Sequence, residues 1–120
     1  MAVVEAKIQT VEDIYCLVRE AVTSRRPIAA NYDGHRRFMC PHRLGRNQEG
    51  RLRVLCYQYG GTSTSGLEPP GSAANWRCLV LEKLGRVELL EGEKWRTAPN
   101  HTRPATCVPD ADVDAEDFAT

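Results

Sequence analysis

A change of hydrophobic period at Pro27 is the feature that most constrains this chain. Before it, apolar residues recur at helical spacing, with Thr10 placed to cap the first turn and Asp13 to complete an approximate capping box. Because the residue before a proline avoids helical backbone, the helix must end close to Pro27. The apolar stripe consists of Val11, Ile14, Tyr15, Leu17, Val18, Ala21 and Val22. The sequence therefore predicts one amphipathic helix over 11–24.

After Pro27 the pattern alternates as a strand does. A strand over 28–32 is followed by a hairpin turn at Asp33-Gly34 and by a returning strand over 36–40 that ends at Pro41. Further apolar runs predict strands over 52–59, 76–81 and 86–90. About five short strands are too few for two large sheets. We therefore expect a mainly-β, mostly antiparallel fold, a small closed barrel with one N-terminal helix packed on it.

The length of 120 residues gives room for one domain. We expect an N-terminal extension over 1–10, the helix and strands over 11–95, and a coil with an acidic tail over 96–120. Within that tail, residues 110–120 are predicted to be disordered. Residues 60–75 are rich in glycine, serine and proline, and they predict a long mobile loop between two strands.

Charge is unevenly distributed, although acids and bases cancel over the whole chain. Residues 110–120 hold five acids and no base, so the remainder has 16 bases against 11 acids. The excess lies early, because residues 19–53 include nine arginines and only three acids. The planar guanidinium fork suits phosphate and carboxylate groups. The alternative is a solvated basic face that recognises nothing.

The five cysteines are an odd number without Cys-X-X-Cys spacing, which argues against a disulfide framework. We therefore expect reduced thiols and a cytoplasmic protein, with Cys40, Cys56 and Cys78 as small core residues. Cys40 and His42 form one pair at a ligand-like spacing, but a structural zinc site takes two such pairs. No metal is therefore expected. No apolar run is long enough to cross a membrane, and none has the pattern of a signal peptide.

The sequence lacks catalytic patterns. No nucleophile elbow or other local signature surrounds a cysteine or histidine. Gly60-Gly61 is followed by serine, threonine and proline residues rather than by a lysine and a helix, so it does not resemble a phosphate-binding loop. We expect no enzymatic activity and no cofactor.

Basic residues on two of the predicted strands lie next to aromatic residues on the neighbouring strands. Arg36, Arg37, His42, Arg43, Arg51 and Arg53 lie around the second and third strands, and Tyr32, Tyr57, Tyr59 and Trp76 lie on neighbouring strands. Such a surface suits an anionic ligand with flat bases, because guanidinium groups hold phosphates and rings stack on bases. The alternative is that the rings are buried in the core and the arginines are only solvated.

The order of these motifs resembles the WYL domain of bacterial transcriptional regulators. The similarity covers about residues 14–90, in which Arg25-Arg26-Pro27, the strand ending at Tyr32, Pro41-His42-Arg43-Leu44, Gly50 and the late strand from Arg77 to Leu84 follow the family's order. The chain departs from that pattern at the Trp-Tyr-Leu tripeptide, which falls on Leu52-Arg53-Val54. It also has Lys83 in place of an arginine and a longer loop over 60–75.

The resemblance implies a five-stranded SH3-like (Sm-like) barrel behind a helix. It also implies a basic groove for nucleic acid or a nucleotide-like ligand, and the residues that match this groove are Tyr32, His42, Arg43, Arg77 and Lys83. We add Arg53, from the tripeptide position, and Tyr57, from the aromatic set, as further candidate ligand-binding residues.

We therefore expect a stand-alone WYL-like module that binds single-stranded nucleic acid or a nucleotide in a regulatory role such as transcription regulation. Only ten residues precede the helix, so we do not expect the winged helix-turn-helix that family members usually carry. The alternative is a protein-interaction or oligomerisation module, acting as a homodimer or with a regulatory partner. In that case the basic face meets an acidic segment, and the chain's own tail is one candidate.

Overall fold

Helix α1 spans Val11–Ser24, as predicted. The computed structural model describes residues 9–64, 66–69, 71–98 and 107–115. At the helix start, Thr10 Oγ1 accepts a hydrogen bond from the Asp13 amide and Asp13 Oδ2 accepts one from the Thr10 amide, both at 3.0 Å. The capping box is therefore complete. At the helix end, Arg25 adopts left-handed backbone with a φ of 53°, and its amide donates to the carbonyls of the last turn.

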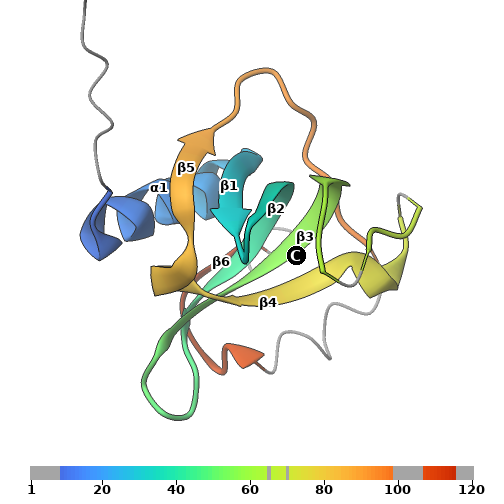
Figure 1. Ribbon diagram of the computed structural model, residues 1–120. Coiled ribbons are helices and arrows are strands. Elements are labelled where there is room, and N and C mark those ends of the chain that lie inside the picture. The colour runs from blue at the N-terminus through green and yellow to red at the C-terminus, as the bar shows by residue number, and fades with distance from the viewer. Residues whose placement is uncertain (1–8, 65, 70, 99–106, 116–120) are drawn as a thin grey trace, which may run out of the picture.

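The described residues form one sheet of six antiparallel strands beside this single α-helix, so the predicted mainly-β class is confirmed. The strands are β1 Ile28–Tyr32, β2 His35–Arg46, β3 Leu52–Gly61, β4 Trp76–Val80, β5 Gly85–Leu89 and β6 Asp110–Asp114. Their order is β4-β3-β2-β1-β5, and β6 pairs with the second half of β2 (Figure 1). The predicted hairpin at Asp33-Gly34 joins β1 to β2, and both residues have positive φ.

Strand β2 is longer than predicted, because it continues through Pro41 instead of ending there. Its pairing with β3 shifts between Pro41 and Arg43, so His42 is the extra residue of a β-bulge. Proline lacks the amide hydrogen that a ladder needs, and a bulge is one of the few places in a sheet that tolerate it. The first half of β2 pairs with β1, whereas the second half pairs with β6.

The sheet is strongly curled. β4 and β5 lie at opposite edges of the five-stranded order, yet only residues 81–84, with the 3₁₀ helix η2 (Leu81–Lys83), connect them. Five strands side by side in a flat sheet span roughly 19 Å, whereas a 3₁₀ helix rises about 2 Å per residue. The edges must therefore approach each other, and Figure 1 shows β4 turning through η2 into β5 at the left of the molecule. Among the described residues these edges do not pair, so the sheet is not closed into a barrel.

Two apolar clusters lie on opposite faces of the sheet. In the larger cluster, Ile14, Val18 and Val22 of α1 pack on strand residues that include Val54. The smaller cluster consists of Leu55, Tyr57, Trp76, Ala98 and Val108. Because side chains alternate along a strand, the neighbours Val54 and Leu55 point into different clusters. The same alternation determines which arginine side chains lie on the same face of the sheet.

The prediction of disorder over 110–120 is wrong for residues 110–115. Strand β6 pairs with β2, and Val113 and Ala115 pack on the larger cluster. The segment Asp-Ala-Asp-Val-Asp alternates with a period of two, which is a strand pattern despite its charge. Residues 116–120 lie outside the described residues. Ala98 and Val108, which follow the predicted domain end at residue 95, are buried in the smaller cluster.

Cys78 of β4 forms a disulfide with Cys107, so the expectation of reduced thiols throughout the chain is wrong. The two residues are 29 positions apart, and no local spacing in the sequence reveals the pair. Cys40 and Cys56 are free and buried, as predicted, whereas Cys16 is free and exposed.

Candidate anion-binding site

Three neighbouring strands bring polar side chains together on one face of the sheet. Arg37 belongs to β2, Gln58 to β3 and Arg77 to β4. Met39 lies opposite Gln58 and Cys56 lies opposite Arg77. Because alternate residues of a strand share a face, positions 37, 58 and 77 point to the same side. We call Arg37, Gln58 and Arg77 the arginine cluster.

Arg37 carries a buried charge with weak partners. Only 4% of the residue is exposed. Its terminal nitrogens donate to Gln58 Oε1 and to the Tyr32 carbonyl, each at 3.3 Å, and its Nε is buried and has no hydrogen-bond partner among the described residues. Both bonds are longer than the usual distance of about 2.9 Å. Because a buried charge with so little compensation is costly, this arrangement requires an explanation.

Arg77 shares the acceptor that Arg37 uses. Its Nε donates to Gln58 Oε1 at 3.3 Å, so two guanidinium groups surround one neutral amide oxygen. Burial, together with the charge of Arg37, lowers the pKa of Arg77. In the described part of the chain, the ion pairs involve other arginines, and no carboxylate pairs with either of these two. The arginine cluster is therefore a concentration of positive charge that the described chain leaves without a counterion.

Tyr32 places an aromatic ring beside this charge. Arg37 Cζ lies 5.3 Å from the centroid of the Tyr32 ring, within the range of a cation–π contact. The Tyr32 hydroxyl accepts a hydrogen bond from the Val80 amide at 3.1 Å, which fixes the ring in place. Of the predicted ligand-binding residues, Tyr32 and Arg77 are thus brought to the same cluster.

Arg77 also holds the segment that connects β3 to β4. It donates to the carbonyls of Ala74 and Gly66, both at 2.8 Å, and to Ser63 Oγ at 3.3 Å. The described residues of the 60–75 segment are therefore hydrogen-bonded to the sheet through Arg77. Backbone carbonyls are neutral acceptors, so they satisfy donors of Arg77 without offsetting its charge.

Tyr57 is part of the same anchoring. Its hydroxyl donates to the Ser72 carbonyl and accepts from the Gly71 amide, both at 2.9 Å. Its ring is buried against Trp76, with the centroids 5.1 Å apart. The structure therefore places Tyr57 as a support of the loop, away from a position where it could face a ligand.

Arg43 points to the opposite face of the sheet. Arg77 pairs with Cys56 of β3, whereas Arg43 pairs with the adjacent Leu55. Adjacent strand residues point to opposite faces, so the structure does not bring Arg43 and Arg77 into one groove. The bulge at His42 determines the face to which Arg43 points, because it inserts one extra residue into β2 before Arg43.

The partners of Arg43 come from the C-terminal segment. Arg43 forms an ion pair with Asp114 of β6, and its Nε donates to the Val108 carbonyl at 2.7 Å. The side chains of Arg43 and Asp114 are 24% and 8% exposed, so this pair is largely shielded from water. The predicted ligand-binding arginine is therefore occupied by the chain's own acidic segment.

His42 is buried in an aromatic cluster. Its ring lies 4.8 Å from the Trp76 ring and 4.7 Å from the Trp95 ring, measured between centroids. Its Nε2 lies 3.1 Å from the Arg96 carbonyl oxygen. His42, of which only 1% is exposed, therefore supports the fold between β2 and residues 95–96.

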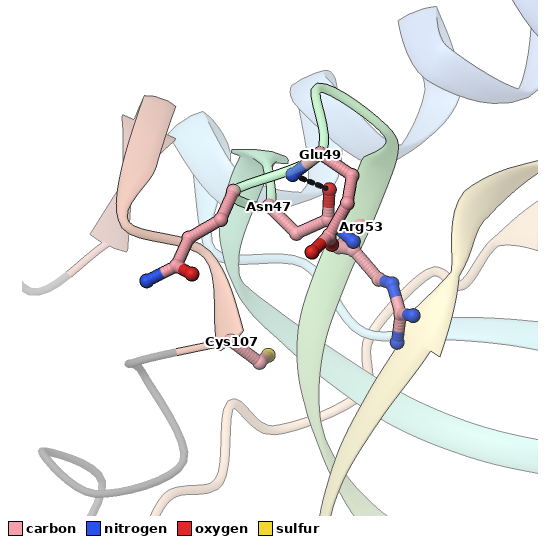
Figure 2. A pocket seen from close by; sticks show the side chains of 5 residues that line it. Asn47, Glu49, Arg53 and Cys107 are labelled. Carbon is pink, nitrogen blue, oxygen red and sulfur yellow. Dashed lines mark hydrogen bonds between the residues drawn. The ribbon is translucent and has the colours of Figure 1, made fainter.

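Arg53 and Lys83 lie outside the arginine cluster. Arg53 lines a hollow of about 350 Å³ with Asn47, Gln48, Glu49 and Cys107 (Figure 2). Within the part of the chain that the structure describes, Arg53 Nε is buried and has no hydrogen-bond partner, as is also the case for Arg37 Nε. Lys83 is exposed on η2. The seven predicted residues are therefore distributed over several parts of the molecule.

Sequence reasoning did not select Arg37 and Gln58 as site residues. Arg37 was one of several arginines near β2, and nothing local separates a buried arginine from a solvated one. Gln58 carries a usable signal, because it is a polar residue that follows the apolar run of β3 on the same face as Cys56. A polar residue on a core-facing position needs partners, and here these are two arginines.

Two observations concern metal binding and membrane insertion. Among the described residues, no three histidine, cysteine, aspartate or glutamate side chains lie close enough to hold a metal ion. Within the same part of the chain, no helix has the length and apolar character that a membrane crossing needs.

Comparison with known proteins adds no relative to these observations. A scan against protein-family models, a search of curated proteins and a search of solved structures each found no match to this chain.

Proposed function

We propose that this chain is a non-enzymatic, WYL-like regulatory module that binds an anionic ligand, single-stranded nucleic acid or a nucleotide, at the arginine cluster. The observation that carries the proposal is the pair Arg37 and Arg77, two buried or half-buried guanidinium groups that share one amide oxygen and form no ion pair among the described residues. A phosphate group would offset both charges and would give Arg37 Nε an acceptor.

The aromatic neighbour favours a ligand with a base. The Tyr32 ring already contacts Arg37, so a phosphate held by Arg37 would lie close to a surface on which a base can stack. Stacking of this kind contributes about 1–3 kcal/mol per base in proteins that bind single strands. A nucleotide or single strand therefore uses more of the site than an inorganic anion does.

Binding at Arg77 involves an exchange of partners. A phosphate that reaches Arg77 replaces the carbonyls of Ala74 and Gly66, which now accept from its terminal nitrogens. Charged acceptors form stronger hydrogen bonds with arginine than neutral carbonyls do. We therefore expect the segment between β3 and β4 to move when the ligand binds.

The proposal includes an SH3-like barrel as the fold. The order β4-β3-β2-β1-β5 and the short η2 connection between the two edge strands support it, because both require a strongly curled sheet. The resemblance to WYL domains in residues 14–90 supports the same assignment.

The proposal also includes a cytoplasmic location for the protein. Disulfides in that compartment are usually transient, catalytic or redox-sensing, so Cys78–Cys107 would be a bond that the cell makes and breaks. The exposed free thiol of Cys16 is consistent with a reducing compartment.

Titration of a fluorescein-labelled oligothymidylate tests the proposed function. We expect Arg37→Gln to weaken binding by about tenfold and to reduce the slope of log affinity against log salt by about 0.7, the contribution of one phosphate contact on a single strand. The matched control is Arg51→Gln, because Arg51 is an exposed arginine paired with Glu82. If the wild-type chain binds neither the oligonucleotide nor adenosine monophosphate at low salt, the proposal is wrong.

A protein-interaction module is the second candidate function. The specific observation in its favour is that Arg43 already binds an acidic strand, in the form of Asp114 of β6. This candidate predicts binding of an acidic polypeptide rather than of a nucleotide, and it depends on the opposite face of the sheet.

A further inference from the structure

The second half of β2 is built to receive a strand. Residues 43–46 pair with β6 in antiparallel orientation, from Arg43 opposite Asp114 to Arg46 opposite Asp110, with a register shift that leaves Asp112 as an extra residue of β6. At Gly45 the two backbones approach so closely that a Cβ atom would lie 2.1 Å from the Asp110 carbonyl oxygen. Any side chain at this position would displace the strand, so β2 has a local adaptation to a neighbouring backbone.

The groups around this edge recognise acidic residues and a carbonyl. Arg43 pairs with Asp114, and the Tyr15 hydroxyl of α1 donates to Asp112 Oδ2 at 2.5 Å. Arg25, at the end of α1, donates to the Ala115 carbonyl at 2.8 Å. The edge therefore combines a backbone template with polar groups that contact Asp112, Asp114 and Ala115 of the bound strand.

Strand β6 itself is held more by backbone and charge than by apolar burial. Asp110 and Asp112 are exposed and Val113 is only half-buried, whereas Asp114 and Ala115 are buried. Strand addition of this kind takes its affinity from main-chain hydrogen bonds and its specificity from alternate side chains. Another extended segment with acidic residues at the positions of Asp112 and Asp114 can make the same contacts.

A covalent tether keeps β6 in place. Cys107 lies three positions before β6 in the chain, and its disulfide joins it to Cys78 of β4. The tether raises the effective concentration of β6 at the β2 edge, which excludes competitors. Cys107 also lines the hollow that contains Arg53, so this end of the disulfide faces a space that a small thiol can enter (Figure 2).

We propose that the Arg43–Arg46 edge of β2, with Tyr15 and Arg25, is a docking site for an acidic extended segment of a partner protein. Strand β6 occupies this site in cis while the Cys78–Cys107 disulfide is intact. This inference concerns the second half of β2 rather than the arginine cluster, and it does not depend on nucleotide binding at that cluster.

Reduction opens the site in two exchange steps. A thiolate of a dithiol attacks one disulfide sulfur, which forms a mixed disulfide and releases the other cysteine as a thiolate that takes up a proton. The second thiol of the dithiol then resolves the mixed disulfide. The products are two cysteine thiols and one oxidised dithiol, and β6 is left without its tether.

The experiment weakens the cis strand and leaves the docking site intact. The full chain with Asp112→Asn and Asp114→Asn is titrated with a fluorescein-labelled peptide of residues 108–115, first oxidised and then in dithiothreitol. We expect the reduced chain to bind at least about tenfold more tightly than the oxidised chain, because the tether no longer favours the cis strand. The same peptide with asparagine at its three aspartate positions should not bind.

Matched variants locate the binding on this edge. Adding Arg43→Gln to the double variant should abolish peptide binding, whereas adding Arg51→Gln should leave it unchanged. Equal affinity in both redox states, or binding that survives Arg43→Gln, would overturn the proposal.

Hydrogen exchange of the wild-type chain keeps the proposal testable if these variants fail to fold. On reduction, amides of residues 110–114 should exchange at least about tenfold faster, while those of β1 and β3 keep their protection. Unchanged protection in β6 after complete reduction would also overturn the proposal.

Discussion

Arginines on the two faces of the sheet have different kinds of partner. On one face, Arg43 has an acidic partner from the same chain, because Asp114 of β6 pairs with it and the Val108 carbonyl accepts from its Nε. On the other face, Arg37 and Arg77 share the single amide oxygen of Gln58 and form no ion pair among the described residues.

The difference separates structural charge from charge available to a ligand. Removing one partner of a buried ion pair is strongly destabilising, so a completed pair such as Arg43–Asp114 holds two segments together. A buried guanidinium without a counterion has no such benefit and lowers stability on its own. Buried charges without a counterion are expected at functional sites, where a bound ligand supplies the missing counterion.

The completed pair gives the largest expected effect. Asp114→Asn keeps the shape of the side chain but leaves Arg43 without its counterion, and we expect a loss of about 3 kcal/mol in the free energy of unfolding. Urea denaturation of the oxidised chain measures this loss. The control is Asp112→Asn on the same strand, because Asp112 is exposed and should matter much less. Equal losses for the two variants would show that the Arg43 pair has no special role.

A smaller effect is expected at Tyr15, which contacts the same strand from α1. Tyr15→Phe removes the hydrogen bond to Asp112, and we expect a loss of about 0.5–1 kcal/mol, typical of one hydrogen bond. Burial, the hydrogen bond to Asp112 and its charge raise the pKa of Tyr15. The folded chain therefore favours the neutral phenol, so this contribution is full below pH 10 and is lost as the pH rises further. A difference between wild type and variant that grows above pH 10 would contradict this assignment.

The helix and the strands could be predicted because their signals are local. Thr10 and Asp13 specify the start of α1, and Asp33-Gly34 specifies the first hairpin. Pro41 misled the prediction, because a proline ends a regular strand but not a strand with a bulge, and the bulge depends on the pairing with β3.

The site could be predicted only in part, because it depends on which face of the sheet each side chain points to and on partners that are distant in sequence. Tyr32 and Arg77 were expected in one groove and do lie at one cluster. Arg43 was expected with them, but the extra residue in β2 turns its side chain to the other face. Asp114 and Cys107 lie far from Arg43 and Cys78 in sequence, and no spacing rule connects such pairs.

The central claim is that Arg37 is retained for a ligand rather than for stability. The most direct measurement compares the free energy of unfolding of wild type and Arg37→Met, with and without oligothymidylate. Without the oligonucleotide, we predict that the variant is more stable than wild type by about 1 kcal/mol, because a buried unpaired charge is replaced by an apolar side chain. At an oligonucleotide concentration of 100 times the wild-type Kd, wild type should gain about 2.7 kcal/mol, whereas a variant that binds about tenfold more weakly should gain only about 1.4 kcal/mol. A variant less stable than wild type by more than about 2 kcal/mol, with the same response to the oligonucleotide in both chains, would show that Arg37 is structural and contradict the claim.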